Sequence, residues 1–155
     1  MTEKPTIQLG DVYRIPLNDG RYAYCQYIHE NKELGSMVQV FSLLTPQPLE
    51  NADPLRESDA MFSPVFVALR AIAQSGRWSR IGSLPLQPFS FPRFRLTMGT
   101  KPGVYHDWRI WDGTNTVWIG DLPENLRKLQ LKGISGYETL EERIVAGTYR
   151  GDRMF

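Results

Sequence analysis

Residues 10–28, GDVYRIPLNDGRYAYCQYI, constrain the fold of this chain more than any other segment. Two runs rich in aromatic and branched residues flank Asn18-Asp19-Gly20. Such runs favour strands, and an Asp-Gly pair supplies the positive φ angles that a tight hairpin turn needs. The sequence therefore predicts a β-hairpin near the N-terminus, with strands over residues 12–17 and 21–29.

The second of these strands is predicted to be covered on both faces. Successive side chains of a strand point to opposite faces, and here Tyr22 and Tyr24 share one face while Ala23 and Cys25 share the other. Residues 37–44, MVQVFSLL, predict a third strand. Three strands joined by short turns form a meander, which is typical of a curled SH3-like sheet or half-barrel.

The middle of the chain is less uniform. Residues 45–63 contain three prolines and predict a long loop. Residues 65–81 favour a hairpin; the alternative is a strand followed by a helix, because residues 68–74 are good helix formers. Further strand signals are residues 94–98 and, as a second hairpin around Asp112-Gly113, residues 105–111 and 116–120.

Two helix signals lie near the C-terminus. Asp121, followed by a proline, a glutamate and leucines at helical spacing, predicts a short helix. Thr139-Leu140-Glu141-Glu142 has the form of a capping box, with Thr139 as the N-cap of a helix over residues 140–146. The first-turn position explains both glutamates better than acid–base chemistry does.

Length and composition fit one globular domain over residues 1–155, with 41% hydrophobic and 23% charged residues. The predicted fold class is mainly β, a β-rich α+β fold. We expect an antiparallel, SH3-like or half-barrel sheet built from hairpins, with one or two short C-terminal helices.

The charges of the chain almost balance, with 18 basic and 17 acidic residues and a net charge of +1. Nucleic-acid binders usually carry a clear basic excess, and nucleic-acid mimics a clear acidic one. The chain as a whole has neither excess, which disfavours nucleic acid as a partner, although a neutral total can hide a local patch. The lone cysteine, the absence of a signal-peptide pattern in residues 1–9 and the absence of a long apolar run predict a cytoplasmic protein with no membrane contact.

No catalytic motif stands out. The chain has no glycine-rich phosphate loop and no nucleophile elbow. His29 and His106 favour plain surface or strand-edge roles over catalysis or metal binding, and Cys25 favours a buried thiol over a nucleophile. We therefore expect no catalytic residues, no metal and no cofactor, and predict that the protein is not an enzyme.

Aromatic residues interleaved with arginine form the remaining signal. Three tyrosines follow Arg14 and Arg21, and Trp108, Trp111 and Trp118 surround Arg109. Such residues fill cores, form protein-binding surfaces or stack nucleic-acid bases, and core packing is the favoured interpretation. In the second hairpin the face that holds Arg109 and Trp111 mixes charge with aromatic surface, so it is the face expected to meet solvent or a partner.

The amino-acid sequence of several segments resembles that of the immunity protein 26 family of bacterial proteins. The strongest piece is Gly10-Asp11-Val12 with Ile15-Pro16-Leu17 and residues 19–24, DGRYAY. Further pieces are Pro64-Val65-Phe66-Val67, Gly76-Arg77-Trp78, Ile81-Gly82, Trp108-Arg109-Ile110 with Asp112-Gly113, and Leu140-Glu141-Glu142-Arg143-Ile144. The resemblance implies a mostly β fold that neutralises a toxin encoded by a neighbouring gene, and it implies no catalytic site.

The predicted function is that of an immunity protein that binds and neutralises a cognate, co-encoded bacterial toxin without catalysis. The alternative is a non-enzymatic β-sheet module that binds nucleic acid or peptide. The candidate partner-binding residues are Arg14, Arg21, Tyr22, Arg109 and Trp111.

Overall fold

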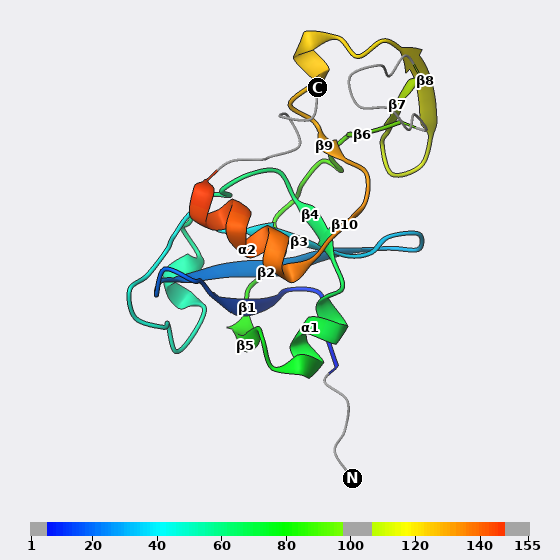
Figure 1. Ribbon diagram of the computed structural model, residues 1–155. Helices are drawn as coiled ribbons and strands as arrows, with labels where there is room; N and C mark the ends of the chain where they lie inside the picture. Colours follow the sequence, from blue (N-terminus) through cyan, green and yellow to red (C-terminus); the bar gives the residue numbers. More distant parts are fainter. Residues whose placement is uncertain (1–5, 98–106, 148–155) are drawn as a thin grey trace. The chain divides into compact units, whose positions relative to one another are not determined.

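The computed structural model describes residues 6–97 and 107–147 (Figure 1). Within these residues the chain forms two α-helices, two single-turn 3-10 helices and short strands. In chain order the elements are β1 (Asp11–Pro16), β2 (Tyr22–Asn31), β3 (Gly35–Val40), η1 (Asp53–Leu55), β4 (Val65–Val67), α1 (Leu69–Ser75), β5 (Ser79–Ser83), β6 (Phe94–Leu96), β7 (Trp108–Trp111), β8 (Thr116–Gly120), η2 (Glu124–Leu126), β9 (Gln130–Leu131), β10 (Ile134–Ser135) and α2 (Tyr137–Ala146).

The chain divides into two compact units. Unit 1 consists of Met1–Pro88 and Ile134–Gly147, and unit 2 consists of Phe89–Gly133 and Thr148–Phe155. Each unit holds one sheet, with the strand order β10-β4-β3-β2-β1-β5 in unit 1 and β8-β7-β6-β9 in unit 2. That the whole chain is one domain stays a prediction.

The predicted β-rich α+β fold is confirmed. Most neighbouring strands pair antiparallel, and two short pairs, β10 with β4 and β6 with β9, are parallel. The predicted N-terminal hairpin is β1 and β2, in the register Ile15 opposite Ala23. Its turn closes through the amide of Leu17, which donates to the carbonyl of Arg21 over 2.9 Å. Gly20 has a φ of +87°, the left-handed conformation that glycine adopts without strain.

β2 is covered on both faces, as its alternating side chains predict. Ala23 and Cys25 are fully buried in the larger core, which also contains residues from β1, β3, β4 and α1. Tyr24 is fully buried on the opposite face, in a smaller core with Ala52 and Leu55 from the 45–63 segment. That segment forms the predicted loop, interrupted by the single turn of η1, and it covers the second face of the sheet.

Residues 65–81 do not form the favoured hairpin, so that prediction is wrong. β4 pairs with β3, α1 follows it, and β5 pairs with β1 at the opposite edge of the sheet. The alternative of a strand followed by a helix is the one that occurs. α1 ends at Gly76, whose φ of +80° makes it a left-handed C-cap.

The last helix is present but begins earlier than predicted. α2 starts at Tyr137, with Gly136 as its N-cap and no side-chain cap hydrogen bond, so Thr139 lies inside the first turn. The prediction that Thr139 caps this helix is wrong. Leu140 and Ile144 are buried in the larger core of unit 1, and Figure 1 shows α2 lying across that sheet.

In unit 2, β7 and β8 form the predicted second hairpin around Asp112-Gly113. The Asp112 carboxylate accepts hydrogen bonds from the amides of Thr114 and Asn115 and so fixes the turn. The helix predicted after Asp121 is the single 3-10 turn η2. The predicted strands at residues 94–98 and 105–111 extend beyond the described residues at 98 and at 105–106.

Candidate partner-binding surface

Three of the five candidate residues gather on the N-terminal hairpin of unit 1. Arg14 projects from β1, and its guanidinium lies 5.9 Å from the centre of the Tyr22 ring at the start of β2. Arg21 forms an ion pair of 2.6 Å with Asp19 in the turn, and the two side chains expose 43% and 33% of their surface. The structure therefore brings Arg14 and Tyr22 together, with the Arg21–Asp19 pair next to them along the chain.

The other two candidates, Arg109 and Trp111, lie on β7 in unit 2. Arg109 is half-buried, and its guanidinium donates to the main-chain carbonyl of Asp107 over 3.2 Å. Trp111 is 3% exposed. Phe91 and Phe94 pack on its ring at centroid distances of 5.5 and 5.6 Å, and the Lys132 ammonium lies 4.5 Å from its centre. Packing within the unit thus covers Trp111, while Arg109 keeps part of its surface open.

The exposed tryptophan of this hairpin is Trp118 on β8. Its exposed fraction is 63%, whereas the other three tryptophans of the chain are buried. Trp118 pairs directly with Arg109 across β7 and β8, so the two side chains lie on the same face of the sheet. The expectation that Trp111 meets solvent is wrong, because neighbours within unit 2 cover its ring, whereas Trp118 is exposed. Which residues bind a partner stays a prediction.

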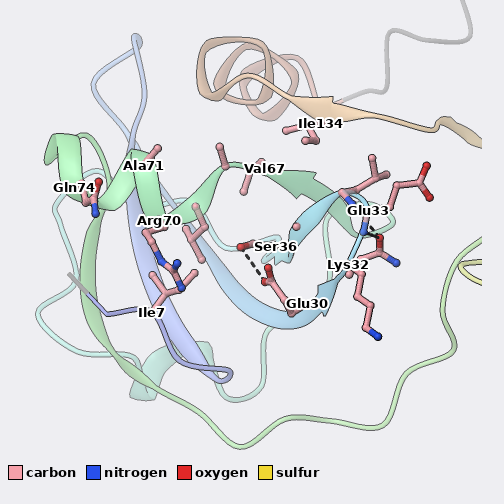
Figure 2. Close-up of a pocket in the computed structure, with 15 residues that line it drawn as sticks. Ile7, Glu30, Lys32, Glu33, Ser36, Val67, Arg70, Ala71, Gln74 and Ile134 are labelled. Atoms are coloured by element: carbon pink, nitrogen blue, oxygen red, sulfur yellow. Dashed lines mark hydrogen bonds between the residues drawn. The ribbon is translucent and has the colours of Figure 1, made fainter. Parts of the chain in front are cut away.

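A cleft of about 790 Å³ opens in unit 1 between the turn from β2 to β3, the start of α1 and β10 (Figure 2). Its lining is partly apolar, with Val67 and Ile134, and partly charged. Figure 2 shows the Glu30 carboxylate directed at Ser36, whose hydroxyl donates to it over 3.2 Å. Sequence reasoning missed this cleft, because its residues come from segments more than a hundred positions apart.

Glu30 also accepts a hydrogen bond from the Tyr27 hydroxyl. Burial and this hydrogen bond raise the pKa of Tyr27 to about 12. Glu30 therefore connects the end of β2 to Tyr27 and Ser36, and it also lines the cleft.

A buried carboxylate on α2, that of Glu141, connects the helix to the segment before β5. It accepts hydrogen bonds from the Arg77 guanidinium, at 3.1 and 2.5 Å, and from the Trp78 indole, at 3.1 Å. The Arg77 guanidinium also lies 5.8 Å from the centre of the Tyr137 ring. These contacts explain Glu141 as a structural residue, whereas Glu142 beside it is exposed.

A second buried carboxylate anchors the start of β1. Asp11 accepts hydrogen bonds from the Gln8 amide, at 2.9 Å, and from Arg80, at 3.0 Å. Gly10 before it has a φ of +98°, and a Cβ there would lie 3.0 Å from the carbonyl oxygen of Leu84. The Gly10-Asp11 pair is thus fixed by the backbone geometry and by the edge strand β5.

Two further reactive side chains, Cys25 and His29, both lie on β2. Cys25 is fully buried on β2, and burial raises the pKa of its thiol. His29 is half-buried near the end of β2, and His106 lies outside the described residues. Over residues 6–97 and 107–147 no group of three or more His, Cys, Asp or Glu side chains could hold a metal ion. No helix in this part of the chain is long and apolar enough to cross a membrane.

The two units carry opposite net charges. Unit 1 has nine basic and twelve acidic residues, a net charge of −3, and unit 2 has nine basic and five acidic residues, a net charge of +4. The near-neutral total of the chain therefore conceals two fields of opposite sign, which act on an approaching partner in different ways.

The model of the immunity protein 26 family matches residues 8–100, well over half of the chain. The chain belongs to this family. Comparison with curated proteins and with solved structures gives no significant match. The matched region begins just before Gly10-Asp11 and contains every strand of unit 1 except β10.

Membership of the immunity protein 26 family gives the buried residues above a common explanation. Gly10, Asp11 and the Arg77-Trp78 pair belong to the segments that resemble the family, and all of them serve the fold of unit 1. The segments that identify the family thus specify the scaffold. Residues that recognise a particular partner are to be sought among the exposed side chains.

Proposed function

We propose that this protein is an immunity protein that binds a cognate toxin encoded by a neighbouring gene and neutralises it in the cytoplasm by stoichiometric, non-catalytic binding. The observation that carries this proposal is the family match over residues 8–100. Inhibition then consists of covering the active site of the toxin or holding it in an inactive shape.

The exposed surface supports a binding role. Stable inhibitory interfaces bury about 1,200–2,000 Å² in total and depend on a few anchors, among which Tyr, Trp and Arg are enriched. Unit 1 presents the half-buried Arg14 next to the half-buried Tyr22, and unit 2 presents Arg109 next to the exposed Trp118. Each pair combines a cation with aromatic surface, so each can dock on apolar and acidic groups of a partner.

The first prediction concerns the anchors of unit 1. Tyr22→Ala and Arg14→Ala should each raise the Kd for the toxin domain by roughly 30-fold, which corresponds to about 2 kcal/mol. Calorimetry with the product of the neighbouring gene measures this, and growth of cells that co-express both proteins reports protection. Because Tyr22 also packs against the smaller core, native amide spectra verify that each variant is folded.

Arg56→Ala is the matched control for these variants. Arg56 is an exposed arginine of unit 1 that is paired with Asp53 and remote from the hairpin turn in sequence. Its loss should leave the Kd within about twofold, as for an uninvolved surface residue. Failure of the wild-type protein both to bind the toxin domain and to rescue growth would refute the proposed function.

A second candidate function is a β-sheet module for single-stranded nucleic acid. The observation that favours it is Trp118, exposed beside Arg109 in the unit with net charge +4. Stacking on aromatic residues and steep salt dependence characterise such binding. Titration of labelled single-stranded RNA and DNA at two salt concentrations distinguishes it from toxin binding.

A further inference from the structure

The sheets of the two units end in four edge strands, and three of these either contain only two residues or carry a charged residue. β9 and β10 contain two residues each. β5 is bulged opposite Val12 and Tyr13, and its Arg80 is bound to Asp11. Short strands, bulges and charged side chains are the features with which native proteins prevent another strand from adding to a sheet edge.

The fourth edge, β8, also has a bulge, because its register with β7 shifts between Trp108 and Arg109, but its residues 116–118 pair with β7 without interruption. Its sequence, TVWIG, contains neither a charged residue nor a proline, and it is longer than β9 and β10. Among the described residues it pairs with β7 on one side and with no strand on the other. An open edge of this kind presents a row of backbone N–H and C=O groups that a further strand can pair with.

The side chains of β8 add apolar surface on both faces of this edge. Val117 is 58% exposed and Trp118 is 63% exposed. They point to opposite faces, with Val117 opposite Ile110 and Trp118 opposite Arg109 on β7. A strand added to β8 would therefore cover apolar surface on both faces and would place one of its side chains near the Arg109 guanidinium.

We propose that the outer edge of β8 receives an extended segment of the cognate toxin as an additional strand, with apolar side chains over Val117 and Trp118 and an acidic side chain near Arg109. This inference rests on the proposed function and specifies the mode of binding. Charge decides between the toxin and a second copy of this chain. Pairing two β8 edges would bring together two units that each carry a net charge of +4, whereas an acidic segment complements that charge.

The test uses the full-length protein and the toxin domain encoded by the neighbouring gene. Amide hydrogen exchange is followed residue by residue with and without that domain. In a strand only alternate amides point outward, so the outward-pointing amides of residues 116–118, which precede the bulge, should gain at least 100-fold protection in the complex. Docking through side chains alone would leave these amides as exposed to exchange as in the free protein, and that result overturns the inference.

Variants give an independent readout. Val117→Lys and Trp118→Lys place charge on the open edge and should each raise the Kd at least tenfold, and Arg109→Glu should do the same by reversing the local charge. The matched control is Val145→Lys, at a 42%-exposed apolar position on α2 in unit 1, which should leave the Kd unchanged. Native amide spectra verify that each variant is folded.

The outcomes separate the two proposals. If the wild-type protein forms no complex, the proposed function fails, and the inference fails with it. If a complex forms and Trp118→Lys binds as tightly as wild type, the inference alone is wrong. A free protein that is dimeric, and that becomes monomeric in Trp118→Lys, would assign the edge to a second copy and would also overturn the inference.

Discussion

At the scale of single residues, one buried carboxylate connects α2 to the segment before β5. Glu141 exposes 3% of its side chain and accepts hydrogen bonds from both Arg77 and Trp78. These residues come from distant parts of the chain, so the contact closes a long loop. A buried carboxylate without its partners would be strongly destabilising, because its desolvation would no longer be compensated.

We therefore expect Glu141→Gln to lower the free energy of unfolding by about 2 kcal/mol, which is less than the roughly 3–5 kcal/mol of a fully buried broken ion pair because Arg77 keeps 38% of its side chain exposed. Denaturant titration measures this effect. The adjacent exposed residue supplies the control, since Glu142→Gln should stay within about 0.5 kcal/mol of wild type. Equal midpoints for the two variants would show that the buried contact adds nothing to stability.

At the scale of elements, the hairpin turns rest on glycines with left-handed backbone. Gly20→Ala should destabilise the protein by about 1 kcal/mol, because φ is +87° there and alanine is strained in that region. Gly133→Ala is the matched control, since a Cβ at Gly133 meets no atom within 4 Å and its φ lies outside the strained range. Thermal unfolding of both variants checks this. A Gly20→Ala midpoint no lower than that of Gly133→Ala would contradict it.

Elements whose signals are local could be predicted from sequence. The Asp19-Gly20 and Asp112-Gly113 turns and the alternation within β2 correctly indicated both hairpins and a strand buried on both faces. The arrangement of residues 65–81 could not be predicted in the same way. β4 and β5 are the two strands that the predicted hairpin over residues 65–81 would have paired. Instead β4 pairs with β3 and β5 pairs with β1, which separates them in the sheet.

The candidate site shows the same limit of local reasoning. Alternation placed Arg109 and Trp111 on one face correctly, and their register with Trp118 agrees. Burial, however, is set by contacts from Phe91, Phe94 and Lys132, which lie on other segments of unit 2. The prediction of Thr139 as a helix cap failed for a related reason. β10 ends at Ser135 and α2 begins at Tyr137 with Gly136 as its N-cap, so the helix has already started before Thr139.

At the scale of the whole molecule, two buried tyrosines make the free energy of unfolding depend on pH in the alkaline range. Burial, with the nearby Asp11 carboxylate, raises the pKa of Tyr13 to about 12, and the pKa of Tyr27 is also raised to about 12. An unfolded chain releases these protons near pH 10. Between pH 10 and 12 the folded state therefore binds more protons than the unfolded state, and the free energy of unfolding falls as the pH rises.

We expect the loss of stability due to these tyrosines to be small below about pH 9 and to grow between pH 10 and 12. The buried Cys25 thiol, whose pKa is also raised, adds a loss that begins at about pH 8.5 and is common to both tyrosine variants. Tyr13→Phe and Tyr27→Phe should each make the decline shallower, because each removes one titrating phenol. Denaturant midpoints at pH 7 and at several values above 10 measure the slope, and the pH 7 value of each variant serves as its own reference. A slope that is the same in both variants as in wild type would refute the assignment.

The return of the chain to unit 1 has a consequence for the timing of protection. Leu140 and Ile144 complete the larger core, yet the ribosome adds them only after all of residues 89–133. The nascent chain therefore carries β1 to β5 with an unfinished core at least until residue 147 has been added. At bacterial elongation rates of about 5–20 residues per second, this takes roughly 7–30 seconds from initiation. On the proposed function, a cell that loses its stock of this protein has no defence during that interval, so immunity depends on a standing reserve made before the toxin arrives.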